Sequence, residues 1–139
     1  MTQLSAYLHF NGNCREAMIF YKECLGGELQ LQVIGETPMA DQMPSEMRDN
    51  ILHSSLVKEG FSLLASDLMG EVRPIKGNTI SLCLDCGSEK EINTYFANLS
   101  AGGEIEHPLK EEFWGAIYGE VTDRFGVKWL FNFDKNQQA

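Results

Sequence analysis

Apolar and polar residues repeat along this chain at two different intervals. Alternation, the period of a half-buried strand, recurs eight times, and spacing of three and four residues, the period of an amphipathic helix, recurs twice. Helices are predicted to begin at Asn13 and at Ser88. Strands are predicted over 4–10, 28–34, 50–57, 61–66, 79–85, about 103–106, 114–121 and 127–133.

The two predicted helices carry matching start and stop signals. Asn13 and Ser88 each precede a glutamate by three residues, which is the spacing of a capping box. Glycine pairs at 26–27 and 102–103 end the helices, and these pairs lie 76 residues apart (102 minus 26). A constant offset of this kind indicates an internal repeat.

The repeated unit is a strand, a helix and three further strands. We therefore predict an α+β fold of two tandem β-α-β-β-β modules, about 1–68 and 77–135, within a single domain of residues 1–139. The helices should cover one face of a mostly antiparallel sheet, and the two modules should lie around a cleft. The segment 67–78 should link the modules.

Charge and hydropathy exclude two classes of partner. The net charge is −9 and the 11 basic residues are scattered, so no phosphate-binding patch is present and nucleic acid is not expected. No apolar run approaches the ~20 residues of a membrane span, and no signal peptide is recognisable at the N-terminus. We expect a cytoplasmic protein that does not bind membranes.

The four cysteines do not form a metal motif. Cys83 and Cys86 have C-x-x-C spacing, but no second such pair and no pair of histidines accompanies them. Cys14 and Cys24 lie towards opposite ends of one helix, too far apart to bridge each other. We expect four free thiols.

The segment 36–49 falls outside the repeat. Its methionines at 39, 43 and 47 have helical spacing. A short surface helix covering the core is one interpretation, and a lid over a binding site is the other, because methionine adapts to varied apolar ligands.

The chain resembles a known family over nearly its whole length. The positions that carry the resemblance are Tyr7-Leu8, Phe10, Gly12-Asn13, Ala17, Phe20-Tyr21, Leu25-Gly26-Gly27, His53, Ser66-Asp67 and the stretch from Phe113 to Trp129. Through them the chain is similar to the PhnB-like branch of the vicinal-oxygen-chelate superfamily, a branch whose domain is often labelled 3-demethylubiquinone-9 3-methyltransferase. The superfamily includes glyoxalase I, bleomycin-resistance proteins and extradiol dioxygenases. The resemblance implies a cupped mixed sheet around a small-molecule cleft, and a homodimer.

The methyltransferase label has no support in the residues. A nucleotide-like cofactor would need a glycine-rich turn between a strand and a helix, followed by an acidic residue, and the sequence contains no such motif. We expect no cofactor.

The superfamily's chemistry depends on a divalent metal held by His and Glu on the outer strands of each module. The corresponding positions here are Ala6, Ala65 or Ser66, Thr79 and Leu130. Alkyl side chains cannot donate to a metal, and neutral hydroxyls are poor substitutes for a carboxylate. We therefore predict no metal site.

His53 and Asp67 are the candidate catalytic residues. A two-residue turn at Glu59-Gly60 would place His53 opposite Ser66 and beside Asp67. An aspartate there could orient the imidazole as a general base. Alternatively, Asp67 caps the end of its strand and His53 makes a polar contact of purely structural importance.

The remaining candidates are expected to line the cleft. Leu8 and Phe10 should face it, and His9 should point to the other face of the strand. Trp114 and Tyr118 share one strand face, on which we also expect Trp129, either as a stacking wall for a ligand or as part of the core. We expect His107 in a solvated loop.

These observations favour a metal-independent protein that binds a small organic ligand through Leu8, Phe10, His53, Trp114 and Tyr118. Two enzymes remain as alternatives: a metal-dependent lyase or dioxygenase, and a metal-free isomerase that uses His53 as its base. A third possibility is a dimerisation module with a filled cleft. Whether the protein is catalytic is left open by its sequence.

Overall fold

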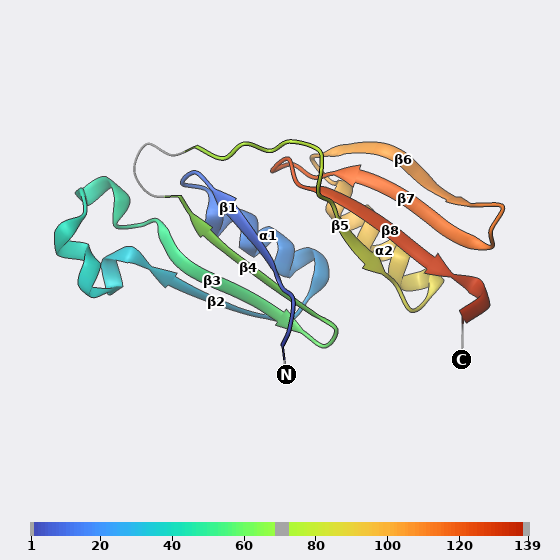
Figure 1. Cartoon of the computed structure of the whole chain (residues 1–139), viewed down its shortest axis with the longest axis horizontal. Coiled ribbons are helices and arrows are strands. Elements are labelled where there is room, and N and C mark those ends of the chain that lie inside the picture. The colour runs from blue at the N-terminus through green and yellow to red at the C-terminus, as the bar shows by residue number, and fades with distance from the viewer. Residues whose placement is uncertain (1, 69–72, 138–139) are drawn as a thin grey trace. The chain divides into compact units, whose positions relative to one another are not determined.

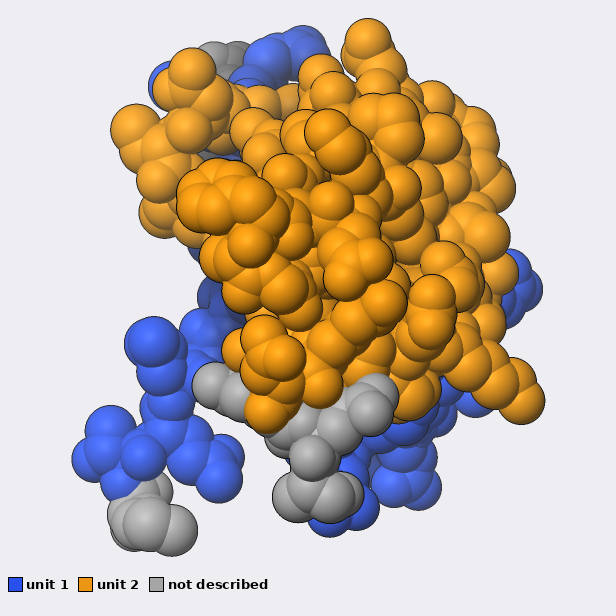
Figure 2. All heavy atoms as spheres, turned by 90° about the vertical axis from the view of Figure 1, so that its right-hand side faces the viewer, with its two compact units in different colours: residues 1–75 blue, residues 76–139 orange. Residues whose placement is uncertain are grey.

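The computed structural model describes residues 2–68 and 73–137. These residues fall into two compact units, residues 1–75 and 76–139, which Figure 2 colours separately. The first unit contains one helix, α1 (Cys14–Leu25), and the second contains α2 (Glu89–Ser100). The strands are β1 (Ala6–Phe10), β2 (Glu28–Val33), β3 (Ile51–Lys58), β4 (Phe61–Asp67), β5 (Leu82–Asp85), β6 (Glu104–Glu111), β7 (Ala116–Thr122) and β8 (Lys128–Asp134).

Each unit is built on a four-stranded mixed sheet, and the two sheets have the same topology (Figure 1). The strand order is β1-β4-β3-β2 in the first unit and β5-β8-β7-β6 in the second. The first strand of each unit pairs in parallel with the last, and the other pairs are antiparallel. The predicted α+β class and the tandem β-α-β-β-β modules are confirmed.

The hairpin between β3 and β4 has the register that its turn predicts. Lys58 pairs with Phe61 across Glu59 and Gly60, and Gly60 has a φ of +98°. A residue without a side chain tolerates this left-handed conformation, so the sequence alone determines how the two strands align.

One face of the first sheet is covered by α1. Cys14, the first residue of α1, lies 3.6 Å (Sγ to Oγ) from Ser54 on β3. Ser54 pairs with Ala65 on β4, which in turn pairs with Leu8 on β1, so all three belong to the helix-covered face. The buried side chains of this core include Phe10, Ala17, Met18, Tyr21, Leu25, Leu56, Leu63 and Ala65.

The opposite face of the first sheet carries mainly polar side chains and no helix of its own unit. We call it the first open face. Strand alternation and the pairing registers assign to it Tyr7, His9, Glu28, Gln30, Gln32, His53, Ser55, Val57, Ser62, Leu64 and Ser66.

A buried aspartate holds the start of α1. Asn13 makes no capping bond to the helix, contrary to the predicted capping box. Asp67 Oδ1 instead accepts hydrogen bonds from the backbone N–H groups of Gly12 (2.8 Å) and Cys14 (3.0 Å). Its Oδ2 accepts from the N–H of Ile51 (2.8 Å), so this carboxylate joins β4 to both α1 and β3.

The second helix begins as predicted. Ser88 Oγ accepts a hydrogen bond from the N–H of Glu91 at 3.1 Å. The Glu91 carboxylate accepts in return from the N–H of Gly87, also at 3.1 Å. The helix start is therefore stabilised locally, by residues next to it in sequence.

The helix-covered face of the second sheet contains a large aromatic core. Phe96 of α2 packs edge to face on Phe131 of β8, with ring centroids 5.1 Å apart. Gly119 of β7 lies against the Phe96 ring, and a Cβ on Gly119 would come within 2.9 Å of that ring. We call the other face, with Tyr118, Glu120, Leu130 and Asn132 at its centre, the second open face.

The methionine-containing segment 36–49 folds into short 3-10 turns rather than an α-helix. Its methionines are half-buried, and whether the segment acts as a lid stays a prediction. Part of the predicted linker 67–78 lies outside the described residues. Within the described ranges, neither helix has the length and apolar character required to span a bilayer.

Candidate functional site

The structure reverses the predicted orientation of β1. Leu8 and Phe10 lie on the helix-covered face, where Phe10 is buried in the core. His9 points to the first open face instead. The sequence shows that these residues alternate, but it does not show which set packs against α1. The apolar set packs there because the core of the unit lies between the sheet and α1.

Three aromatic side chains gather on the first open face. The ring of Tyr7 lies 5.0 Å from that of His9 and 6.1 Å from that of His53, measured between centroids. His53 therefore occupies an open face, as a ligand-contacting residue requires. Its neighbours are Tyr7 and His9 rather than Leu8 and Phe10.

His53 and Asp67 are not partners. They alternate onto opposite faces of the sheet, and among the residues described no hydrogen bond or ion pair joins them. Both carboxylate oxygens of Asp67 accept backbone N–H groups in a buried position. The alternative interpretation of Asp67, a structural cap, is the one that its contacts support.

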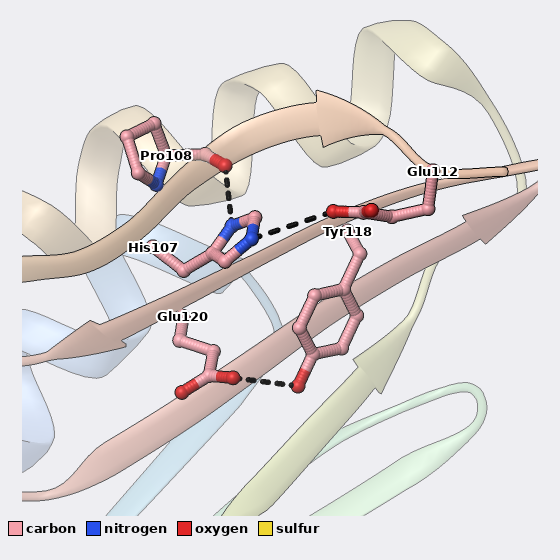
Figure 3. A network of polar contacts seen from close by, with 5 residues as sticks. All are labelled: His107, Pro108, Glu112, Tyr118 and Glu120. Carbon is pink, nitrogen blue, oxygen red and sulfur yellow. Dashed lines mark hydrogen bonds and ion pairs between the residues drawn. The ribbon is translucent and has the colours of Figure 1, made fainter.

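The second open face carries a set of polar contacts shown in Figure 3. The Tyr118 hydroxyl donates a hydrogen bond to Glu120 Oε2 at 3.0 Å. Glu120 Oε1 forms an ion pair with Lys128 Nζ at 3.3 Å. All three residues come from the β7–β8 hairpin, so its two-residue alternation brings them together.

His107 takes part in the same region, although the sequence indicated a loop. It lies on β6, where its ring packs edge to face on Tyr118 with centroids 5.7 Å apart. Its Nε2 is 3.4 Å from Glu112 Oε1, and its Nδ1 is 2.7 Å from the carbonyl oxygen of Pro108. The β6–β7 pairing contains register shifts on both sides of His107, which alternation within one strand does not predict.

The two tryptophans have different environments. Trp114 is 52% exposed, and its ring lies 6.4 Å from that of Tyr118. Trp129 is 3% exposed on the helix-covered face, and its Nε1 donates to Asp123 Oδ2 at 2.8 Å. The prediction that Trp129 shares a face with Tyr118 is wrong, because Trp129 pairs with Val121, an odd number of residues from Tyr118.

The environment of Tyr118 keeps its phenol protonated. Burial raises the pKa of Tyr118 to about 12, and the hydrogen bond to Glu120 and the charge of that carboxylate act in the same direction. Tyr118 can therefore act as a hydrogen-bond donor over the whole physiological range, while Glu120 offers a negative charge beside it.

The residues at the superfamily's metal positions do not fit a metal. Ala6 and Leu130 have no donor atom, and Ser66 and Thr79 offer neutral hydroxyls. Within residues 2–68 and 73–137, no group of three or more His, Cys, Asp or Glu side chains is arranged to hold an ion. We derive no chemical step through a metal.

With two β-α-β-β-β units and one open face on each sheet, the structure defines a glyoxalase-like α+β protein. The model of the family described as 3-demethylubiquinone-9 3-methyltransferase matches residues 2–131. The chain belongs to this family. The same fold recurs at lower identity in solved glyoxalase/bleomycin resistance/dioxygenase proteins.

Individual relatives support the same placement. Protein YjdN of Escherichia coli (strain K12) is 36% identical over 143 residues, covering 96% of this chain and 97% of YjdN. The crystal structure of PA1353 from Pseudomonas aeruginosa is 38% identical, with a TM-score of 0.86 and coverage of 96% and 98%. A putative PhnB protein from Bacillus cereus is 22% identical, with a TM-score of 0.71 and coverage of 95% and 99%, which shows a shared fold.

Proposed function

We propose that this PhnB-like protein binds a small organic molecule without a metal, and that Trp114 and Tyr118 of the second open face contact it. The observation that carries the proposal is the half-exposed ring of Trp114, which lies in the turn before β7 and contacts Tyr118 on a sheet face that α2 does not cover. An exposed tryptophan next to ordered polar groups is typical of a surface that stacks against a ring and hydrogen-bonds its substituents.

The polar contacts around these rings suggest how a ligand would be oriented. Tyr118 and Glu120 place a hydroxyl and a carboxylate 3.0 Å apart, and Lys128 and His107 add further donors nearby. Because Glu120 and Glu112 are already paired, they are held in fixed positions before a ligand arrives. Binding would therefore require little ordering of side chains.

A fragment screen tests the proposal. Mono- and bicyclic aromatic compounds would be screened by saturation-transfer NMR, and the best of them titrated against the purified protein. Trp114→Ala should weaken binding up to about tenfold, since a stacked ring contributes about 0.5–1.5 kcal/mol, and Trp114→Phe should restore part of it.

Ile105→Ala is a matched control. Ile105 is 50% exposed in the same unit, and its partner Val121 belongs to the helix-covered face. Removing it should leave affinity unchanged. Equal affinity of Trp114→Ala and the unmodified protein would contradict the assignment of this face.

Metal dependence separates the proposal from its main rival, a metal-dependent lyase or dioxygenase. Chelator-treated protein would be unfolded thermally with Mn, Fe(II), Co, Ni or Zn. A bound metal at about 100 times its Kd adds about 2.7 kcal/mol to the unfolding free energy, which raises the Tm by several degrees. We expect no saturable rise, and a rise with any one of these metals would favour the enzyme.

A metal-free isomerase that uses His53 as its base is a weaker candidate. The proposed orienting partner, Asp67, lies on the other face of the sheet and binds three backbone N–H groups. If isomerase turnover is found with any substrate, His53→Ala should abolish it while the protein stays folded, and retained turnover would exclude this mechanism.

The proposal includes a homodimer, which rests on the family resemblance, and a cytoplasmic location, which rests on the sequence pattern alone. Sedimentation velocity over a range of protein concentrations tests the dimer. A single species with the mass of one chain at all concentrations would contradict it.

A further inference from the structure

The strands β2 and β6 end the antiparallel sides of their sheets, and their outer edges differ (Figure 1). In the part of the chain that the structure describes, β2 pairs with β3 alone and β6 with β7 alone. Glu104, the first residue of β6, is the repeat counterpart of Glu28, 76 positions earlier (104 minus 28). The two edges can therefore be compared residue by residue.

The edge of β6 is protected against pairing with a further strand. Pro108 has no backbone N–H, and the register of β6 shifts on both sides of His107. Half of the residues of β6 are charged: Glu104, Glu106, Lys110 and Glu111. Proline, irregular register and charged side chains are the features by which natural proteins prevent edge strands from joining one another.

The edge of β2 has none of these features over residues 29–33. This stretch, Leu-Gln-Leu-Gln-Val, contains no proline and no charged residue. The register shift at its end comes from an additional residue on β3, Leu52, because Gln32 pairs with His53 and Val33 with Ile51. The backbone of β2 is therefore regular along its outer side.

The hairpin geometry determines which backbone groups of β2 point outwards. Lys58 and Phe61 flank a two-residue turn, so they form a hydrogen-bonded pair between β3 and β4. Backbone groups alternate in direction along a strand, so residues 53, 55 and 57 of β3 bond to β2, where their partners are 32, 30 and 28. The N–H and C=O groups that point away from the sheet are therefore those of Leu29, Leu31 and Val33.

The apolar core of the first unit also reaches this edge. Leu29 and Leu31 pair with Leu56 and Ser54, which are 0% and 1% exposed on the helix-covered face. The side chains of β2 on the same face, Leu29, Leu31 and Val33, are only half-buried. A row of apolar side chains and a row of outward backbone groups thus coincide on one strand.

We propose that β2 pairs antiparallel with β2 of a second copy of this chain, about a two-fold axis at Leu31. The inference rests on the proposed homodimer and assigns its interface. In this register Leu31 lies opposite Leu31 of the partner subunit, and Leu29 lies opposite Val33 of the partner subunit. The outward groups then meet in three pairs, each with two hydrogen bonds. A two-fold axis at Gln30 would leave two such pairs.

The side chains and the charge of β2 fit the same register. Gln30 lies opposite Gln32 of the partner subunit, where the two amides can hydrogen-bond each other. Glu28 lies outside the paired residues, and the two copies of Glu28 are six positions apart, about 20 Å at 3.3 Å per residue. This separation exceeds the Debye length of about 8 Å at physiological ionic strength. The one charge on the strand therefore does not oppose pairing.

A proline variant tests the backbone contacts. Leu31→Pro removes an N–H that points out of the sheet, which an edge strand tolerates, but it removes two hydrogen bonds from the dimer, one from each copy. The Kd of the dimer, measured by sedimentation velocity, should rise at least about tenfold. Leu31→Val is the matched control, because it keeps the N–H, and its Kd should change much less. Circular dichroism checks the folding of both variants.

Charge variants test the register without a change of the backbone. Gln30→Lys combined with Gln32→Lys sets lysines opposite each other across the axis, and Gln30→Glu combined with Gln32→Glu sets carboxylates opposite each other. Each double variant alone should dimerise several-fold more weakly, because like charges that face each other repel. An equimolar mixture of the two should recover the dimer, because opposite charges then face each other.

The outcomes separate this interface from the homodimer itself. An unchanged Kd in Leu31→Pro or in both charge variants would overturn pairing at β2 and leave the homodimer standing. Charge variants that remain equally weak in the mixture would overturn the register. An unmodified protein with the mass of one chain at all concentrations would overturn both the interface and the homodimer.

Discussion

The two units have the same topology but opposite chemistry on their open faces. The first open face presents histidine, serine and glutamine side chains, and Glu28 is the one carboxylate among the strand residues assigned to it. The second presents the ion pair of Glu120 with Lys128 and the contact of His107 with Glu112, beside an exposed tryptophan. Since the fold is the same in both, the side chains of an open face can vary without changing the topology of the sheet.

The helix-covered faces differ in how they fill the same space. Leu8 pairs with Ala65 in the first unit, and Leu84, its repeat counterpart, pairs with Phe131 in the second. The residue next to Ala65 across the hairpin is Ser54, whereas the residue next to Phe131 is Gly119. Two small side chains in one core are thus replaced by one large ring and a glycine that makes room for it.

The largest expected effect is on the free energy of unfolding, and it distinguishes two buried aspartates, one in each unit. Asp67 accepts hydrogen bonds from backbone N–H groups 16 to 55 positions away. The hydrogen-bond donors to Asp123 lie within six positions of it: the backbone N–H groups of Phe125 and Val127 and the indole N–H of Trp129. Asp67→Ala should lower the free energy of unfolding by about 3–5 kcal/mol, because it leaves buried donors unsatisfied across three elements. Asp123→Ala should cost about 2 kcal/mol. Urea unfolding followed by circular dichroism measures both.

Asp85→Ala is the control for this pair. Asp85 accepts an exposed hydrogen bond from Asn132 at 3.1 Å, so its removal should change the unfolding free energy by less than about 1 kcal/mol. If Asp67→Ala is no more destabilising than Asp85→Ala, the carboxylate does not hold the first unit together.

The next effect tests the exchange of side-chain volume between the two cores. A Cβ at Gly119 would lie 2.8 Å from Leu109 and 2.9 Å from Phe96. Gly119→Ala should therefore destabilise the protein by about 1–3 kcal/mol through overpacking. Ser54→Ala, at the equivalent position of the first unit, should cost about 1 kcal/mol for its lost hydrogen bond.

A double variant sharpens this test. Combining Gly119→Ala with Phe96→Leu should recover part of the loss if the ring is the obstacle. A Gly119→Ala protein as stable as the unmodified one would show that the second core has spare room.

The fold could be predicted from the sequence because each unit contains strong local signals. The helix stops at Gly26 and Gly102 and the turn at Gly60 require positive φ, and all three have it. The Ser88 cap and the Lys58–Phe61 register also depend on residues close together in sequence. Signals of this kind do not depend on tertiary contacts.

The candidate site was harder to predict because it depends on which face a helix covers. Leu8 and Phe10 alternate with Tyr7 and His9 in either orientation, and packing of α1 decides between them. His107 was missed because the pairing of β6 shifts register on both sides of it. The sequence did contain a signal for the contact between Asp123 and Trp129. Asp123 precedes a turn that brings Trp129 back beside it, and the indole N–H of a buried tryptophan needs an acceptor.

A smaller, pH-dependent effect compares the cysteines of the two units. Burial raises the pKa of Cys14 in the first unit to about 12, from an ordinary value of 9.0. Burial also raises the pKa of Cys86 to about 12, with the charges of Glu91 and Asp85 adding to it. Between pH 9 and 12 the unfolded chain loses these protons while the folded chain keeps them. The contribution of these two thiols to the free energy of unfolding should therefore be fully present below pH 9. It should be lost progressively as the pH rises towards 12.

Urea unfolding at a series of pH values measures this loss. Cys14→Ala should make the decline above pH 9 less steep, because the variant no longer carries that thiol. Burial also raises the pKa of Cys83, but its side chain is exposed, so Cys83→Ala should change the slope less. A slope that is identical in all three proteins would mean that the buried thiols do not control alkaline unfolding.

The smallest effect concerns a single proton on the second open face. Burial raises the pKa of Tyr118 to about 12, and the hydrogen bond to Glu120 contributes to the shift. Titration followed by the ultraviolet absorbance of tyrosinate should therefore contain one late component that is absent from Tyr118→Phe. Glu120→Gln should move that component to lower pH, because the amide removes the neighbouring charge, without changing the fold. A late absorbance of the same size in Tyr118→Phe as in the unmodified protein would show that Tyr118 does not contribute to it, and the second open face would lose the ordered donor that sets it apart from the first.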